Sequence, residues 1–201
     1  MSSQLQFDEA THVYSVRGAV KPSVTKIISD LKLAPPYPED DPKGLKPFGT
    51  ACHKAAELRM WDRLGDCDSR IQPYIDGLDE KIREMRIRPI KTELRMYHGE
   101  LDVAGTLDLY CEIYDRELAV IDYKTGTPPP CVELQLAGYA DMLTKSIAGG
   151  FVPIQPQLIR RFSMQLTPRR ALVRECPNRA FDHHAWRAAV TLWKWQNDRR
   201  K

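Results

Sequence analysis

The sequence predicts one α/β (α+β) domain, in which a central mixed β-sheet is flanked by helices and preceded by an N-terminal β-hairpin. Two observations support this fold class. Hydrophobic residues recur at helix spacing on both sides of a central region in which they alternate with polar residues at a spacing of two. The chain has 201 residues, which suits one domain, and shows neither an internal repeat nor a linker-like stretch. The expected order around one sheet is two helices, three strands, one helix, two strands and one helix.

The N-terminal segment, residues 1–47, is expected to hold a hairpin, a short helix and a proline-rich loop. The stretch 5–20 has strand-forming residues on either side of polar turn residues. A helix follows over 22–31, and Ser23 is its expected N-cap. Residues 32–49 contain five prolines and two glycines, so they are expected to be irregular.

The remaining elements divide into a core, residues 48–147, and a C-terminal segment, residues 148–201. In the core, helix spacing and strand alternation predict helices, three successive strands and a further helix. The predicted ranges are 50–64 and 71–86 for the first two helices, 90–98, 100–113 and 117–124 for the strands, and 131–147 for the last helix. The C-terminal segment is expected to form strands over 155–166 and 169–175 and a helix over 181–201.

Composition excludes several classes of protein. At 42% hydrophobic and 28% charged residues the chain is neither disordered nor membranous, and no apolar run is long enough to span a bilayer. The N-terminus lacks a secretory signal, so a cytoplasmic location is expected, in the host cytoplasm if a phage encodes the protein. Five scattered cysteines without a CxxC pair argue against disulfides and zinc sites. The net charge of +3 does not by itself indicate a nucleic-acid binder.

Two central strands carry charged residues where a sheet is usually apolar. Residues two apart on a strand share a face, so Asp122 and Lys124 should point together, while Asp108 should face away from Leu107 and Leu109. If the two strands are neighbours, the two aspartates approach each other and repel unless a cation lies between them. Hard oxygen ligands of this kind suit Mg²⁺ or Mn²⁺. The alternative is an exposed strand face with a simple Asp–Lys pair.

Four short motifs in this region resemble the signature of the PD-(D/E)XK nuclease superfamily, in its RecB-like, phage-type exonuclease form. They are GTACHKAAE, GTLD, DYK and QLAGY, and they occur in the order found in that family. The opening segment, from residue 7, also resembles that of phage-encoded members. The resemblance implies a restriction-endonuclease-like core and a metal-dependent DNA nuclease. The residues that match the motifs are Gly49, His53, Glu57, Gly105, Asp108, Asp122, Lys124, Gln135 and Tyr139.

The resemblance also implies a metal site for one or two Mg²⁺ or Mn²⁺ ions. Following the family, His53 becomes a ligand beside Asp108 and Asp122, and the backbone carbonyl of Tyr123 completes the protein ligands. Glu57 shares a helical face with His53 and would support it or a second ion, or would be a surface charge. Glu93, on the preceding strand, is a further candidate acidic group. Only Cys176 follows the core, so no iron–sulfur cluster is expected.

The catalytic assignment covers Asp108, Asp122, Lys124, Gln135 and Tyr139. A divalent ion on the aspartates would lower the pKa of bound water, and Lys124 would position that water or stabilise charge in the transition state. Gln135 and Tyr139 would orient Lys124 or a phosphate, with a packed, hydrogen-bonded tyrosine as the alternative. The resemblance implies products with 5′ phosphates.

Basic residues of the C-terminal segment are candidate contacts to DNA phosphates, although such charges are often only solvated surface. They are Arg160, Arg161, Arg169, Arg170 and Arg174, with Lys194, Arg199, Arg200 and Lys201 near the end of the chain. The sequence therefore favours an exonuclease of phage or bacterial recombination, repair or replication over a sequence-specific endonuclease. Its expected partners are DNA with free ends, single- or double-stranded, and phage or host recombination proteins. The alternatives are an inactive nucleic-acid-binding module with the same fold and a phosphoesterase acting on small molecules.

Overall fold

The structure is a computed structural model that describes residues 5–35, 44–145, 155 and 158–198. The strands are β1 (Leu5–Asp8), β2 (Val13–Val16), β3 (Ala19–Lys21), β4 (Arg88–His98), β5 (Val103–Ile113), β6 (Glu117–Lys124), β7 (Arg160–Leu166) and β8 (Ala171–Glu175). The helices are α1 (Val24–Asp30), α2 (Leu45–Met60), α3 (Gln72–Met85), α4 (Val132–Lys145) and α5 (Arg179–Asp198).

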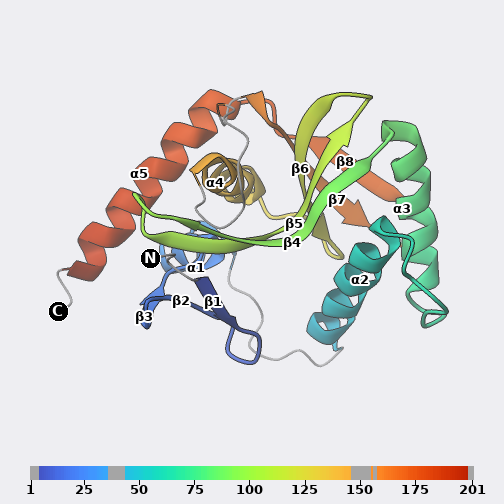
Figure 1. Cartoon of the computed structure of the whole chain (residues 1–201), viewed down its shortest axis with the longest axis horizontal. Coiled ribbons are helices and arrows are strands. Elements are labelled where there is room, and N and C mark those ends of the chain that lie inside the picture. The colour runs from blue at the N-terminus through green and yellow to red at the C-terminus, as the bar shows by residue number, and fades with distance from the viewer. Residues whose placement is uncertain (1–4, 36–43, 146–154, 156–157, 199–201) are drawn as a thin grey trace.

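A five-stranded mixed sheet with the order β4-β5-β6-β7-β8 forms the centre of the fold (Figure 1). β6 and β7 are parallel and are joined through α4, whereas the other neighbouring strands are antiparallel. One hydrophobic core lies between the sheet and helices α2 and α3, and a second lies on the opposite side, beneath α4, α1 and α5. The predicted α/β fold class, with helices on a mixed sheet, is therefore confirmed.

The N-terminal hairpin is extended by a third strand, so that β1, β2 and β3 form a small antiparallel sheet of their own. This sheet is attached to β5 at two places. The Tyr14 hydroxyl lies 2.7 Å from the Thr106 hydroxyl, and Ser23 forms an isolated β-bridge with Ala104. The attachment brings α1, which follows β3 directly, close to the central sheet.

The helix boundaries lie close to the predicted ones except in α2, which ends at Met60, four residues before its predicted end. Ser23 caps α1 as predicted, because its hydroxyl accepts a hydrogen bond from the Lys26 N–H at 3.0 Å. Helix α2 begins at Leu45, five residues before its predicted start, and so includes Pro47. A proline is tolerated there because the N–H groups of a first helical turn have no partner within the helix.

The alternation of β5 breaks at Asp108. Leu107 belongs to the core beneath α4, whereas Leu109, two residues further on, belongs to the core beneath α2 and α3. The prediction that both leucines share one face opposite Asp108 is therefore wrong. Glu93, which lies across from Asp108 between registered pairs of β4 and β5, has a left-handed backbone with φ of 46°. This irregularity lies opposite the point at which the faces exchange. The ribbons of β4 and β5 are strongly curved (Figure 1).

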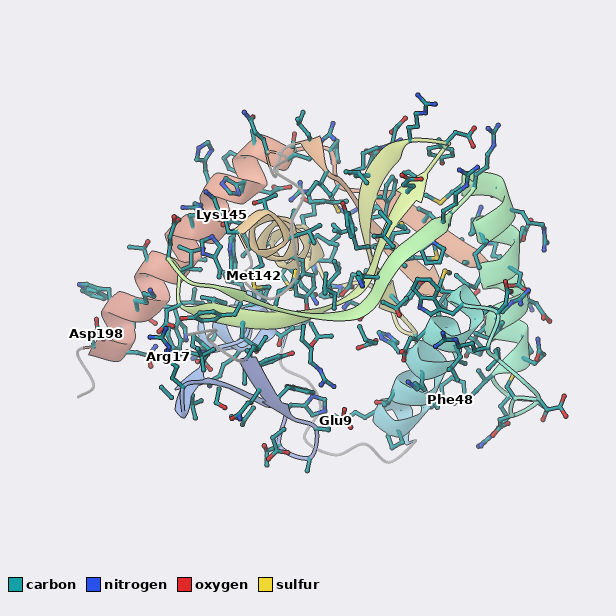
Figure 2. All side chains as sticks on the ribbon, viewed as in Figure 1. Glu9, Arg17, Phe48, Met142, Lys145 and Asp198 are labelled. Atoms are coloured by element: carbon teal, nitrogen blue, oxygen red, sulfur yellow. The ribbon has the colours of Figure 1, made fainter. Side chains whose placement is uncertain are left out.

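Gly105, the glycine of the GTLD motif, allows α4 to approach the sheet closely. A Cβ atom built at this position would lie 2.9 Å from Met142 Cε and 3.2 Å from Tyr139 Cε1. Figure 2 shows Met142 pointing from α4 into the space above the curved strands. The glycine therefore brings the helix that carries Gln135 and Tyr139 into contact with the strand that carries Asp108.

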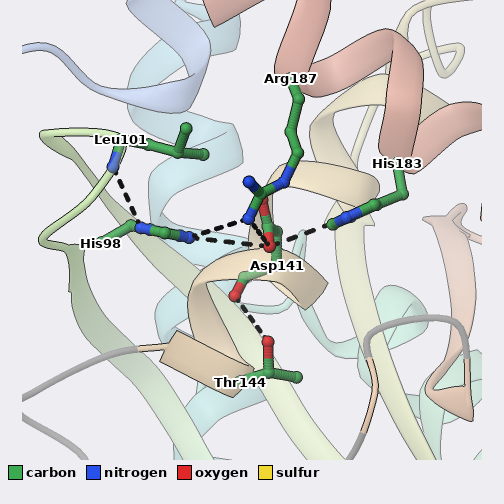
Figure 3. A network of polar contacts seen from close by, with 6 residues as sticks. All are labelled: His98, Leu101, Asp141, Thr144, His183 and Arg187. Carbon is green, nitrogen blue, oxygen red and sulfur yellow. Dashed lines mark hydrogen bonds and ion pairs between the residues drawn. The ribbon is translucent and has the colours of Figure 1, made fainter.

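A buried polar network joins the β4–β5 turn to helices α4 and α5 (Figure 3). Asp141, fully buried on α4, accepts a hydrogen bond from Arg187 Nη2 at 3.1 Å and lies 3.7 Å from His98 Nε2 and 3.9 Å from His183 Nδ1. The Leu101 N–H donates to His98 Nδ1, so the proton of a neutral His98 lies on Nε2, toward Asp141. Burial alone would raise the pKa of Asp141, but contacts with basic side chains outweigh it and hold this pKa below its ordinary value.

Helix α5 packs against α4 and α1 through a stripe in which Trp186 and Val190 are buried and Trp193 is partly buried. The Trp193 indole N–H also donates to Asp30 at 2.8 Å, which ties the end of α5 to α1. Neither α5 nor any other helix in the described part of the chain combines the length and the apolar character that crossing a membrane requires.

Candidate active site

The end of β6 brings together four of the residues that the motifs singled out. Asp122 and Lys124 point to the same side of the strand, as predicted, and Lys124 Nζ lies 2.5 Å from Asp122 Oδ2. Gln135 Nε2, on α4, donates to Asp122 Oδ1 at 3.0 Å and also lies 3.1 Å from the Tyr139 hydroxyl. Lys124 Nζ donates to Gln135 Oε1 at 3.4 Å. Gln135 therefore bridges the two charged groups. Its amide N–H donates to the Asp122 carboxylate, and its amide oxygen accepts from the Lys124 ammonium.

A second group of side chains lies beside this cluster and has the composition of a cation site. His53 on α2, Glu93 on β4 and Asp108 on β5 each offer a ligand atom, and these three atoms lie within 4.8 Å of one another. Two carboxylate oxygens and one imidazole nitrogen form a donor set that can hold a divalent cation, and the two carboxylates favour a hard one. The three residues come from three separate elements, so the group exists only in the folded chain.

Asp108 connects the two groups. Its Oδ2 atom accepts a hydrogen bond from the backbone N–H of Tyr123 at 2.7 Å, between Asp122 and Lys124, and lies 3.6 Å from His53 Nδ1. Since Tyr123 is the residue between the aspartate and the lysine of β6, this bond sets the separation of the two groups.

Burial dominates the electrostatics of the acidic residues. Loss of solvent raises the pKa of Asp122 to about 6, although the neighbouring Lys124 opposes this shift. Loss of solvent and the charge of Asp108 raise the pKa of Glu93 to about 7. Both shifts come mainly from burial, and the charge of Asp108 adds to each, so a bound cation would favour the ionised forms of both carboxyl groups.

The pKa values of the two basic residues of the site are also raised, which favours the charged form of each. Burial alone would lower the pKa of Lys124, but the charge of Asp122 outweighs it and raises the pKa, so the side chain is an ammonium at neutral pH. Burial would likewise lower the pKa of His53, but its contact with Asp108 raises it. Lys124 is thus suited to stabilise negative charge rather than to accept a proton.

A cleft of about 590 Å³ opens beside these residues, between α1 and α2. Helix α2 contributes His53 to its lining, and α1 and the residues after it contribute Thr25, Ala34 and Pro35. The floor is the end of β6 and the segment that leads toward α4. The lining also includes Tyr123, Lys124, Thr125, Gly126, Thr127 and Pro129. The α1 side of this cleft was missed by sequence reasoning, because no motif links α1 to β6.

The motif glycine Gly49 explains how α2 reaches the site. A Cβ atom at this position would lie 3.0 Å from Thr125 Oγ1, just beyond the end of β6. The absence of a side chain therefore allows the first turns of α2 to pack against this strand end, and His53 follows one turn later.

Two of the predicted ligands differ in their surroundings from His53 and Asp108. Glu57 forms an ion pair with Lys54 at 2.6 Å, and its charge adds to the rise in the pKa of Glu93, so its role stays a prediction. Asp122 faces Lys124 and Gln135 and is not one of the three residues whose ligand atoms cluster within 4.8 Å. Its role as a ligand, like that of the Tyr123 carbonyl, stays a prediction.

The predicted DNA contacts of β7 and its turn lie at two different places. Arg161 is 1% exposed and forms an ion pair with Asp182 at 2.6 Å, so its assignment as a phosphate contact is wrong. Arg160 is held between two carboxylates at the start of β7, opposite Ala119 and far from Lys124.

Arg169 and Arg170 are exposed in the turn between β7 and β8. Because β7 runs parallel to β6 and Lys124 pairs with Gln165, this turn lies at the same end of the strands as the candidate site. Arg174 forms an ion pair with Glu133. Lys194 lies on α5 and is half-buried, and Arg199, Arg200 and Lys201 lie outside the described residues, so the role of these four basic residues stays a prediction.

The fold and the site together define a class of protein. Its members have carboxylates and a lysine that meet at the end of the strands of a mixed sheet, and helices cover both faces of that sheet. Residues 63–193 match the PD-(D/E)XK nuclease superfamily, and because this match spans more than half of the chain, the protein belongs to that superfamily. The match includes Asp108, Asp122, Lys124 and Gln135 but begins after His53. The comparison with curated proteins found no match. Membership indicates a nuclease, an enzyme that hydrolyses phosphodiester bonds in a nucleic acid and typically binds a divalent metal.

Proposed function

We propose that the protein is a metal-dependent deoxyribonuclease that hydrolyses DNA from free ends and leaves 5′ phosphates. The observation that carries this proposal is the convergence of His53, Glu93 and Asp108 beside the Asp122–Lys124 pair. A cation-binding group next to a fixed ammonium is the arrangement that phosphodiester hydrolysis requires, since negative charge develops on the phosphoryl oxygens.

The ion is Mg²⁺ or Mn²⁺, as one ion or two. His53, Glu93 and Asp108 would hold it, with Asp122 and the Tyr123 carbonyl as further candidates. A bound divalent ion supplies an activated water and neutralises charge on a phosphate oxygen. Oxygen-rich ligand sets favour these hard cations over softer metals.

The surrounding side chains orient the reacting groups. Lys124 would hold its ammonium against the attacked phosphate, where it stabilises charge in the transition state. Gln135 restrains both Lys124 and Asp122, and its own amide is restrained by Tyr139. These two α4 residues are therefore positioning residues, whose loss should reduce the rate less than loss of Lys124.

The biological setting belongs to the same proposal. The RecB-like order of motifs and the N-terminal segment that resembles phage-encoded members favour an exonuclease of phage or bacterial recombination, repair or replication. Such an enzyme would work in the cytoplasm beside recombination proteins of the phage or the host. Arg169 and Arg170 support a role in holding DNA, because they lie at the edge of the sheet that carries the site.

Digestion of end-labelled linear DNA and closed circular DNA in Mg²⁺ or Mn²⁺ tests the proposal. We expect linear DNA to be degraded to 5′-phosphorylated products and closed circles to be spared. Lys124→Ala should lower the rate by about 100-fold or more, as expected for loss of a group that stabilises transition-state charge. Lys145→Ala, an exposed lysine of α4, is the matched control and should leave the rate unchanged. A folded, metal-loaded protein that spares all DNA would refute the proposal, and cleavage of small phosphate esters instead would indicate a phosphoesterase.

A further inference from the structure

The cleft between α1 and α2 restricts which form of DNA can reach the candidate site. We infer that it receives one nucleotide unit of an unpaired strand, with the phosphate at His53 and Lys124 and the nucleoside against the α1 side. This inference rests on the proposed function and deepens it, because it assigns single-stranded DNA, or a frayed end, as the form that reacts.

The size of the cleft is the first argument. Pockets of about 300–1,000 Å³ accommodate ligands of the size of a small drug, which is also the size of one or two nucleotides. The cleft measures about 590 Å³. A duplex has a major groove about 12 Å wide and carries two strands, so it cannot enter a space of this size.

The distribution of charge along the cleft is the second argument. Its two basic side chains, His53 and Lys124, lie toward the candidate metal group. Among the described residues, the rest of the lining is uncharged, and it includes Ala34 and Pro35 after α1 and Pro129 before α4. A phosphate is favoured beside the two basic side chains, and a base or deoxyribose is favoured against the uncharged lining. One nucleotide of a single strand likewise has a charged phosphate and an uncharged nucleoside.

The position of the walls is the third argument. Thr25 lies on α1 and His53 on α2, so the floor at Lys124 is flanked by helices on two sides. A phosphate on the surface of an intact duplex is accompanied by the neighbouring strand, which would meet one of these walls. Binding to phosphates of a duplex also depends on many lysine and arginine contacts, whereas Lys124 is the single lysine among the described residues of this lining.

Rates on matched substrates provide the first test. A single-stranded oligonucleotide and a duplex with frayed, mismatched ends should be digested at least about tenfold faster than a blunt, fully paired duplex of the same sequence, because unpairing the end costs a few kcal/mol. Equal rates on all three substrates would overturn the inference and leave the proposed nuclease function intact.

Binding to a variant with a filled cleft provides a test that does not need activity. Thr25→Trp places a large ring in the cleft from an exposed position on α1, and Ser29→Trp, exposed one turn further along the same helix and outside the lining, is its control. With a fluorescent oligothymidylate in Ca²⁺, we expect Thr25→Trp to weaken binding about tenfold, the scale of one lost base contact, and Ser29→Trp to leave it unchanged. Equal binding by both variants, at equal melting temperatures, would overturn the inference even if the protein cleaved no DNA.

Discussion

Asp108 on β5 and Tyr123 on β6 are joined by a hydrogen bond in which the Tyr123 N–H donates to Asp108 Oδ2 at 2.7 Å. This bond lies just beyond Leu109 and Ile121, the last registered pair between the two strands. The same oxygen lies 3.6 Å from His53 Nδ1. Asp108 therefore links the middle of β5 to the end of β6 and also faces α2, so that one carboxylate joins the two halves of the site.

Replacing Asp108 with asparagine should remove activity without unfolding the chain. The amide side chain introduced by Asp108→Asn keeps an oxygen that can accept the Tyr123 N–H, but it lacks the negative charge that a cation needs. Changes outside the ligand sphere of a metal commonly cost about 10–100-fold, so loss of a ligand should lower DNA hydrolysis by at least about 100-fold. Mn²⁺ should also no longer raise the melting temperature, since a ligand stabilises only a fold that binds it.

The control for this variant is Glu112→Gln, which removes a carboxylate from the same strand at a position paired with Leu118. It should retain both the activity and the Mn²⁺-dependent rise in melting temperature. If Mn²⁺ raised the melting temperature of Asp108→Asn as much as that of the wild type, the assignment of Asp108 as a ligand would fail.

The raised pKa values of Glu93 and Asp122 predict how stability depends on pH without metal. In the folded chain these pKa values are about 7 and about 6, above the ordinary values of 4.5 and 3.8. Between about pH 4 and 7 the folded chain therefore keeps protons that the unfolded chain has released, so stability falls as the pH rises. In EDTA, the contribution of these two carboxyl groups to the melting temperature should decrease across this window, against the opposite contribution of groups such as Asp141, whose pKa is lowered.

Glu93→Gln should flatten this pH dependence, because the amide stays neutral in both states, whereas Glu112→Gln should leave it in place. Mn²⁺ should oppose the decrease at higher pH, where both carboxylates are available as ligands. The measurement is thermal unfolding at a series of pH values with and without metal. A Glu93→Gln protein whose melting temperature changed with pH in EDTA in the same way as that of the wild type would contradict the prediction.

Gly77 on α3 is predicted to be a packing requirement rather than a source of flexibility. A Cβ atom at this position would lie 2.8 Å from the backbone of Arg170 and Ala171, in the turn that leads into β8. Alanine would gain about 1 kcal/mol in helix propensity, but overpacking against backbone costs about 1–3 kcal/mol. We expect Gly77→Ala to destabilise the protein by about 1 kcal/mol in urea unfolding.

Gly65→Ala is the matched control, because its Cβ atom would meet nothing within 4 Å. Its free energy of unfolding should stay close to that of the wild type. A Gly77→Ala protein as stable as the Gly65→Ala protein would show that the β7–β8 turn can move away from α3.

We expect Arg161 to have a structural role and Arg169 to have a role in binding DNA. Arg161→Met leaves Asp182 buried without its partner, which should cost about 3–5 kcal/mol of stability. The double variant Arg161→Met/Asp182→Leu should recover part of this loss.

Arg169→Ala, in the exposed turn at the edge of the site, should leave stability unchanged but weaken DNA binding and reduce its dependence on salt.

Urea unfolding and binding titrations at several salt concentrations measure these effects. A stable Arg161→Met protein with weakened DNA binding would reverse the two roles. An Arg169→Ala protein with unchanged affinity and salt dependence would remove the β7–β8 turn from the DNA-binding surface.

Local patterns in the sequence were sufficient to predict most of the elements and the same-side projection of Asp122 and Lys124. Strand alternation places residues two apart on one side wherever the strand is regular, and β6 is regular at this point. The Ser23 cap was predictable for a similar reason, since a hydroxyl before a helix bonds to a backbone N–H three residues away.

Only the tertiary structure decided which side chains meet at the site. The alternation of β5 changes face at Asp108, opposite the left-handed backbone of Glu93, and a single irregular position leaves no periodic signal in the sequence. The burial of Arg161 was equally invisible, because an arginine paired with a distant aspartate has the same local pattern as a solvated one. The cleft forms where α1, α2 and the end of β6 come together, and packing between distant segments determines that arrangement.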